Sequence, residues 1–127
     1  MASRRVFRRT PLLTPEQKKA LLENGRRQQD AQRQGRAEDF FPVVKLFTPD
    51  AGATWLLSEV SPDEPDIAFG LCDLGLGFPE LGYVSLAELE TLLGPAGLPV
   101  ERDLHFRADK PLSAYAAEAH AQGRVVT

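Results

Sequence analysis

The sequence predicts a small single α+β domain: an antiparallel sheet, made of a three-stranded meander plus one or two further strands, with helices on one face and a basic N-terminal arm. Three observations predict it. The chain has 127 residues, the size of one domain. Helix-capping signals alternate with short runs of β-branched and aromatic residues. The first three of these runs are joined by loops too short for the crossover that parallel strands require.

The two ends of the chain carry opposite charge. Residues 1–36 contain ten of the 15 Lys and Arg but three of the 18 Asp and Glu, a balance of +7; residues 37–127 contain five against fifteen, a balance of −10. We therefore divide the chain into residues 1–39, a basic arm with a short helix and a polar linker, and residues 40–127, the α+β domain. Clustered arginines attract phosphate, which predicts nucleic-acid contact through Arg4, Arg5, Arg8, Arg9, Arg26 and Arg27. Alternatively, the arm lies on an acidic surface of its own domain or of a partner.

The first elements follow from local signals. Thr14 and Gln17 form a capping-box pattern around Pro15, which predicts a helix that begins at Pro15 and ends at Asn24 and Gly25. Residues 26–39 have almost no apolar side chain, and are predicted to be a solvated linker or a frayed helical extension. Strands are predicted over residues 43–47, 54–60 and 67–73.

The second half of the chain alternates between extended and helical signals. An apolar glycine loop at 74–79 leads to a short extended piece at 81–84, and Ser85 with Glu88 predicts a capped helix over 86–93. A strand is predicted over 100–107. The last helix is predicted over 112–122, capped by Ser113 or Asp109.

Several classes of protein are excluded by composition. No apolar run approaches the roughly 20 residues that cross a bilayer, and the basic start is not followed by the apolar segment of a signal peptide. We expect a cytoplasmic bacterial protein that does not bind a membrane. The single cysteine, Cys72, lies in an apolar run and is predicted to be a buried small hydrophobe.

Three strings resemble a known family. They are Lys45-Leu-Phe-Thr-Pro-Asp-Ala-Gly-Ala-Thr-Trp55, Phe69-Gly-Leu-Cys-Asp-Leu-Gly-Leu-Gly-Phe78 and Leu98-Pro-Val-Glu-Arg-Asp-Leu-His-Phe106. The chain thereby resembles the bacterial family catalogued as domain of unknown function 2958. The resemblance implies a setting on plasmids, integrative conjugative elements and phages, beside genes for DNA transfer and defence. It implies no activity, and no catalytic residue carries over from it.

The stretch whose side chains are best suited to catalysis or metal binding is Glu101 to His105. On the predicted strand, Glu101, Asp103 and His105 share one face, where they could ligate a divalent metal or carry out acid–base chemistry. Further acids that would complete such a site are Asp50, Glu59, Asp73 and Glu80. The alternative, which we favour, is that this face meets solvent and that the chain holds no catalytic residue, metal or cofactor.

The glycine loop and Trp55 are the remaining candidates. Gly75-Leu-Gly-Phe78 is similar to the carboxylate-binding loop of PDZ domains, but Pro79 removes a donor from the strand that follows. We therefore predict a tight apolar turn that packs Leu76 and Phe78 into the core. Trp55, near the turn at residues 50–54, is the candidate for an exposed recognition residue.

These observations favour a non-enzymatic accessory protein of a mobile genetic element that binds a protein or nucleic-acid partner. One alternative is a small metal-assisted hydrolase or nuclease that uses Glu101, Asp103 and His105. A second is a peptide- or protein-binding module that uses the sheet edge or the glycine loop. A free strand edge beside a small core also favours a homo-oligomer.

Overall fold

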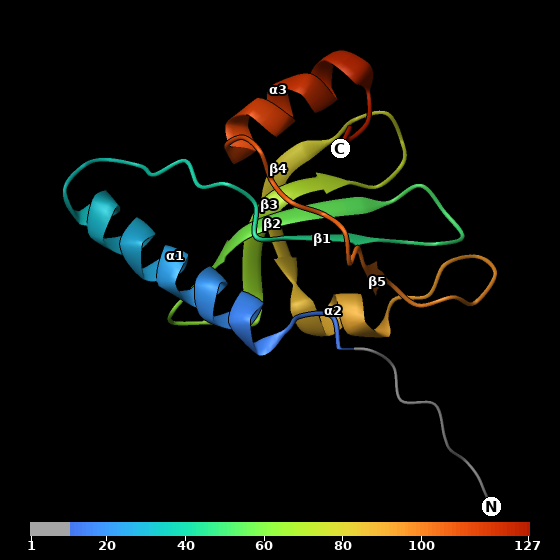
Figure 1. Cartoon of the computed structure of the whole chain (residues 1–127), viewed down its shortest axis with the longest axis horizontal. Coiled ribbons are helices and arrows are strands. Elements are labelled where there is room, and N and C mark those ends of the chain that lie inside the picture. The colour runs from blue at the N-terminus through green and yellow to red at the C-terminus, as the bar shows by residue number, and fades with distance from the viewer. Residues whose placement is uncertain (1–10) are drawn as a thin grey trace, which may run out of the picture.

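The computed structural model describes residues 11–127, which form three helices and a five-stranded antiparallel sheet (Figure 1). The predicted α+β class is confirmed. The strands lie in the order β4-β3-β2-β1-β5, so β4 and β5 are the edges. In chain order, the elements are α1 (Pro15–Arg33), β1 (Val44–Phe47), β2 (Thr54–Val60), β3 (Ile67–Asp73), β4 (Glu80–Ser85), α2 (Leu86–Thr91), β5 (Glu101–Arg102) and α3 (Leu112–Gln122).

The helices cover both faces of the sheet, so the prediction of helices on one face is wrong. Trp55 and Leu57 of β2 pack in the core cluster that contains Leu21 of α1 and Leu89 of α2. Leu56, between them, points the other way and belongs to a second cluster with α3. Figure 1 shows α3 on one side of the sheet and α1 and α2 on the other. The consecutive apolar residues of β2 are the pattern of a strand that is buried on both faces.

Helix α1 begins as predicted but extends further than predicted. The Thr14 hydroxyl accepts a hydrogen bond from the Gln17 amide, and the Gln17 side chain accepts one from the Thr14 amide, both at 3.0 Å. The helix then continues past Gly25 to Arg33, so the predicted stop at Gly25 is wrong and the helical extension is confirmed. The left-handed residue that follows the helix is Gly35, with φ of +73°.

Gly25 permits a close approach between α1 and β2. A Cβ atom at this position would lie 1.8 Å from the carbonyl oxygen of Val60. Beside this contact, the Asn24 side chain donates a hydrogen bond to the Ser58 carbonyl at 2.9 Å. Since β1 pairs with β2 only over residues 54–57, α1 occupies the edge of β2 that β1 leaves open.

Two elements in the second half also differ from prediction. β5 is limited to Glu101 and Arg102, because the Asp103 carboxylate accepts a hydrogen bond from the His105 amide at 2.8 Å and turns the chain. Helix α3 is not capped by Ser113 or Asp109. Instead, Asp39 accepts hydrogen bonds from the amide and the hydroxyl of Ser113. No helix within residues 11–127 combines the length and hydropathy that crossing a bilayer requires.

Candidate functional site

The structure keeps two residues of the predicted acid–base site together and separates the third, Glu101, from them. Asp103 and His105 line a depression of about 400 Å³ together with Lys45 and Glu118, whereas Glu101 does not line it. The side chains of Glu101 and His105 are exposed. The predicted common face depended on a strand through residue 107, and the turn at Asp103 ends that strand after Arg102.

Asp103 has a structural role in this turn. The hydrogen bond from the His105 amide, followed by the Lys45 ammonium 3.5 Å from the carboxylate, lowers the pKa of Asp103. A carboxylate held in this way is a poor proton acceptor near neutral pH. No group of three or more His, Cys, Asp and Glu side chains in residues 11–127 is placed to hold a metal ion.

The four acids predicted to complete that site do not line the depression at Asp103. One carboxylate oxygen of Asp50 accepts hydrogen bonds from the amides of Ala96 and Leu98, at 2.7 and 3.3 Å. Glu59 accepts one from Gln28 at 3.1 Å. Glu80 does not line the depression at Asp103. Asp73 accepts a hydrogen bond from the Gly75 amide in the glycine loop, as described below.

The other predicted binding residues lie in different environments. Trp55 is buried in the core, so its ring is not accessible to a partner. Arg26 and Arg27 are both exposed, and Arg27 pairs with Glu38 at 3.4 Å and lies over the Phe40 ring. Arg4, Arg5, Arg8 and Arg9 lie outside the described residues. Cys72 is half-buried against the core, and this burial raises the pKa of its thiol.

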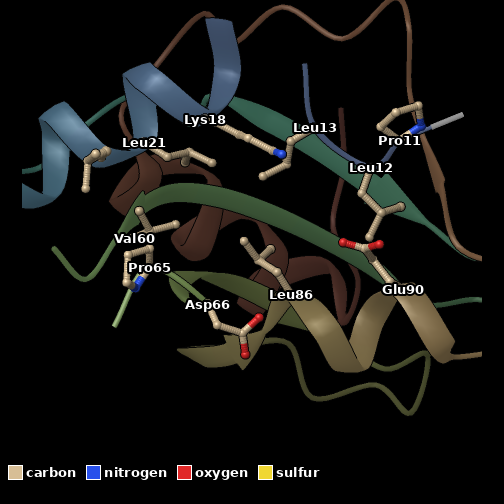
Figure 2. A pocket seen from close by; sticks show the side chains of 11 residues that line it. Pro11, Leu12, Leu13, Lys18, Leu21, Val60, Pro65, Asp66, Leu86 and Glu90 are labelled. Atoms are coloured by element: carbon tan, nitrogen blue, oxygen red, sulfur yellow. The ribbon is translucent and has the colours of Figure 1, made fainter. Parts of the chain in front are cut away.

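An apolar groove of about 480 Å³ lies between the first turns of α1 and helix α2. Figure 2 shows Leu12, Leu13 and Leu21 facing this space with Leu86, and the charged residues Lys18, Asp66 and Glu90 also line it. Leu12, Leu13 and Leu21 are already buried by their own neighbours. The groove therefore leaves little apolar surface for a partner to cover.

The large exposed apolar surface lies instead on residues 74–83, which we call the β4 edge. Leu76 is 74% exposed, Phe78 82% and Tyr83 73%, and Leu74 and Leu81 are also exposed. The prediction that Leu76 and Phe78 pack into the core is wrong. Apolar side chains gathered on one exposed segment are typical of an interaction surface.

A buried carboxylate holds the β4 edge in place. Asp73 accepts hydrogen bonds from the Gly75 amide at 2.8 Å and from the Val125 amide at 2.9 Å, which ties the loop to the end of the chain. Gly75 and Gly77 have φ of +80° and +92°, a conformation that L side chains rarely adopt. The loop backbone is thus anchored while its leucine and phenylalanine side chains point into solvent.

No strand of residues 11–127 lies beside the outer backbone of β4. Leu86 donates to the Asp66 carbonyl and Ser61 donates to the Ile67 carbonyl, so even-numbered residues of β3 bond toward β4 and odd-numbered ones toward β2. Because Gly70 pairs with Gly82, the residues of β4 that bond to β3 are the even-numbered ones. The N–H and C=O groups of Leu81 and Tyr83 therefore point outward.

The fold and this site define a small α+β protein with a five-stranded antiparallel sheet, whose apolar edge at β4 is left free by the part of the chain that the structure describes. The family model described as protein of unknown function (DUF2958) matches residues 12–126, and the chain belongs to this family. No curated protein and no solved structure matches the chain.

From the sequence, this surface is expected to be functional only under the last of the three candidate functions, the peptide- or protein-binding module. The signal was present in the run of apolar residues 74, 76 and 78 inside a glycine loop, a place where solvated turns are usually polar. A turn that meets solvent and a turn that packs inward have the same local pattern. The strand order, which puts β4 at the edge, distinguishes them.

Proposed function

We propose that the protein is a non-enzymatic interaction protein that binds an extended segment of a partner protein as an added strand beside β4. The observation that carries the proposal is the free edge at Leu81 and Tyr83, whose outward backbone groups lie among exposed apolar side chains. In strand addition, main-chain hydrogen bonds supply affinity and alternate side chains supply specificity. We further propose that the protein acts in the bacterial cytoplasm. The family resemblance implies that it is an accessory protein of a mobile genetic element.

The expected affinity is modest. Each added main-chain hydrogen bond contributes about 1 kcal/mol net. Covering a side chain such as Phe78 or Tyr83 contributes about 1.5–3 kcal/mol. The ordering of an extended segment opposes these gains, so we expect dissociation constants on the order of micromolar. The fifteen acids against five bases in residues 37–127 favour a segment with basic side chains.

Peptide selection with exchange measurements tests the proposal. Twelve-residue peptides selected from a random library against the full chain are expected to slow amide hydrogen exchange at Leu81 and Tyr83. Gly82 and Val84, whose amides already bond to β3, are expected to change little. Replacing Leu81 by lysine should weaken binding at least tenfold, because it puts a charge in the apolar contact.

The matched control is Leu104→Lys, which alters a leucine that is also exposed but lies outside the β4 edge. It should bind the selected peptides as tightly as the unaltered chain. Peptides that protect amides elsewhere, or that bind the Leu81→Lys variant normally, would contradict the proposal. If two copies pair through β4 instead, sedimentation will show a dimer that Leu81→Lys dissociates, and the partner is then a second copy.

Nucleic-acid contact through the arm is a second candidate, favoured by the ten Lys and Arg of residues 1–36. With labelled duplex DNA, binding should weaken steeply with salt. Deleting residues 1–10, which contain Arg4, Arg5, Arg8 and Arg9, should lower the slope of log K against log salt by about 3–4, close to 0.9 for each phosphate contact. Anisotropy measures both quantities. Absence of binding at low salt would remove this candidate.

A further inference from the structure

A second groove, of about 440 Å³, lies on the α3 side of the sheet and borders β4. The sheet forms its floor, α1 contributes Gln28 and Gln32, and α3 contributes Leu112 at one end. Five residues that line this groove also line a smaller hollow of about 150 Å³. They are Gln28, Gln32, Glu59, Phe69 and Tyr83. Among the candidate site residues named from the sequence, only Glu59 lines this groove.

The floor of this groove combines a carboxylate with two aromatic rings. Glu59 pairs with Phe69 across β2 and β3, and Phe69 pairs with Tyr83 across β3 and β4, so all three lie in one row on the same face. The ring centroids of Phe69 and Tyr83 are 5.0 Å apart, at an interplanar angle of 57°. The Tyr83 ring, which is mostly exposed, extends this row to the β4 edge.

Glu59 differs from the other acids of the groove. Glu38 pairs with Arg27 and Arg36, and Asp39 accepts hydrogen bonds from Ser113. Glu59 accepts a hydrogen bond from the side-chain amide group of Gln28 but forms no ion pair within residues 11–127. Partial burial raises the pKa of Glu59, and the bond from Gln28 offsets this only in part.

A half-buried carboxylate beside aromatic rings suits a cation. A cationic group over a ring face is attracted by the quadrupole of the ring, and a nearby carboxylate adds an ion pair. Arginine fits both groups better than lysine does, because its planar guanidinium stacks on rings and binds carboxylates through two parallel hydrogen bonds. We infer that the groove at Glu59, Phe69 and Tyr83 binds an arginine side chain of the segment that β4 captures.

That the arginine belongs to the segment captured by β4 rests on the proposed function. Whether the groove binds arginine can be tested independently. The probe is N-acetyl-L-arginine methylamide, titrated into the isotope-labelled full chain and followed by NMR. We expect saturable shifts of the Glu59 carboxyl and the Tyr83 ring, with a dissociation constant on the order of millimolar for so small a ligand. N-acetyl-L-lysine methylamide should bind more weakly.

Glu59→Gln should weaken arginine binding at least tenfold while keeping the shape of the side chain. The matched control is Glu64→Gln, an exposed acid outside the groove, which should leave binding unchanged. Tyr83→Phe should bind the probe, whereas Tyr83→Ala should not. Equal binding by Glu59→Gln and the unaltered chain would overturn the inference.

The pH dependence distinguishes a binding role from a structural one. The folded-state pKa of Glu59 is raised, so the free protein gains stability as this group is protonated and loses it above that pKa. Glu59→Gln should therefore melt at a higher temperature than the unaltered chain at pH 7; a lower melting temperature would indicate that the Glu59 carboxylate supports the fold. Bound arginine should lower the pKa of Glu59. Affinity should fall as Glu59 is protonated. Glu38 and Asp39 are the other acids that line the groove.

The two proposals can fail separately. If selected peptides bind at β4 without an arginine preference and the arginine probe does not bind, the groove is not an arginine site and the proposed function stands. If the probe binds but no peptide protects Leu81 and Tyr83, the arginine site stands and strand addition is wrong. If neither binds, both are wrong.

Discussion

Replacing Gly25 by alanine is expected to destabilise the fold by at least about 2 kcal/mol, although alanine is the better helix former. The added Cβ would lie 1.8 Å from the Val60 carbonyl oxygen and 3.1 Å from its carbon. Backbone atoms on both sides leave no flexible group to move, so α1 must shift away from β2. Overpacking of this kind typically costs about 1–3 kcal/mol and exceeds the gain of about 1 kcal/mol in helix propensity when the overlap is with backbone.

Urea unfolding of the two proteins measures this loss. The matched control is Gly82→Ala in β4, where a Cβ atom meets nothing within 4 Å and φ is not positive. That variant should be neutral or slightly stabilised, because glycine inside a strand is unfavourable. A Gly25→Ala protein as stable as the unaltered chain would show that α1 does not pack on β2 through this glycine.

Replacing Asp73 by alanine is the second large effect, with an expected loss of about 2–4 kcal/mol. The carboxylate is buried and accepts hydrogen bonds from the amides of Gly75 and Val125. Removing it leaves both amides without their acceptor, and each unsatisfied donor costs about 1–3 kcal/mol when water cannot reach it. The glycine loop and the end of the chain should loosen together, since one side chain holds both.

Hydrogen exchange at Gly75 and Val125, together with the free energy of unfolding, measures the effect of Asp73→Ala. Asp73→Asn retains one carbonyl acceptor and should lose less stability than alanine. Asp63→Ala is the control, because Asp63 is exposed and, among residues 11–127, accepts a hydrogen bond only from the Gln29 side chain, so its change should stay within about 0.5 kcal/mol. Unchanged exchange at both amides in Asp73→Ala would contradict the anchoring role.

The elements that depend on neighbours in sequence were predicted well. The Thr14 and Gln17 capping box, three strands and the start of α2 at Leu86 are all present. Predictions failed where a distant backbone decides the outcome. The Asn24-Gly25 pair has the local features of a helix stop, yet α1 continues because Gly25 fits against Val60 and because Asn24 and Gln28 bond to the segments around β2.

The candidate site shows the same division. The sequence placed an apolar glycine loop before a short extended piece, and both are present. The sequence did not show that these two segments are exposed, because the exposure of Phe78 depends on which strand lies at the edge of the sheet. Glu59 was visible as an acid in an apolar strand, but its row with Phe69 and Tyr83 comes from a register that includes an irregularity between Leu57 and Glu59.

By itself, the sequence determined the α+β class, the antiparallel meander and the uneven charge, because caps, strand runs and charge counts are properties of neighbouring residues. Only the tertiary structure decided that helices cover both faces, that Asp103 ends β5 instead of facing a metal, and that β4 is a free edge beside a carboxylate and two rings. These outcomes depend on strand order, register and backbone approach between segments tens of residues apart, which no local pattern encodes.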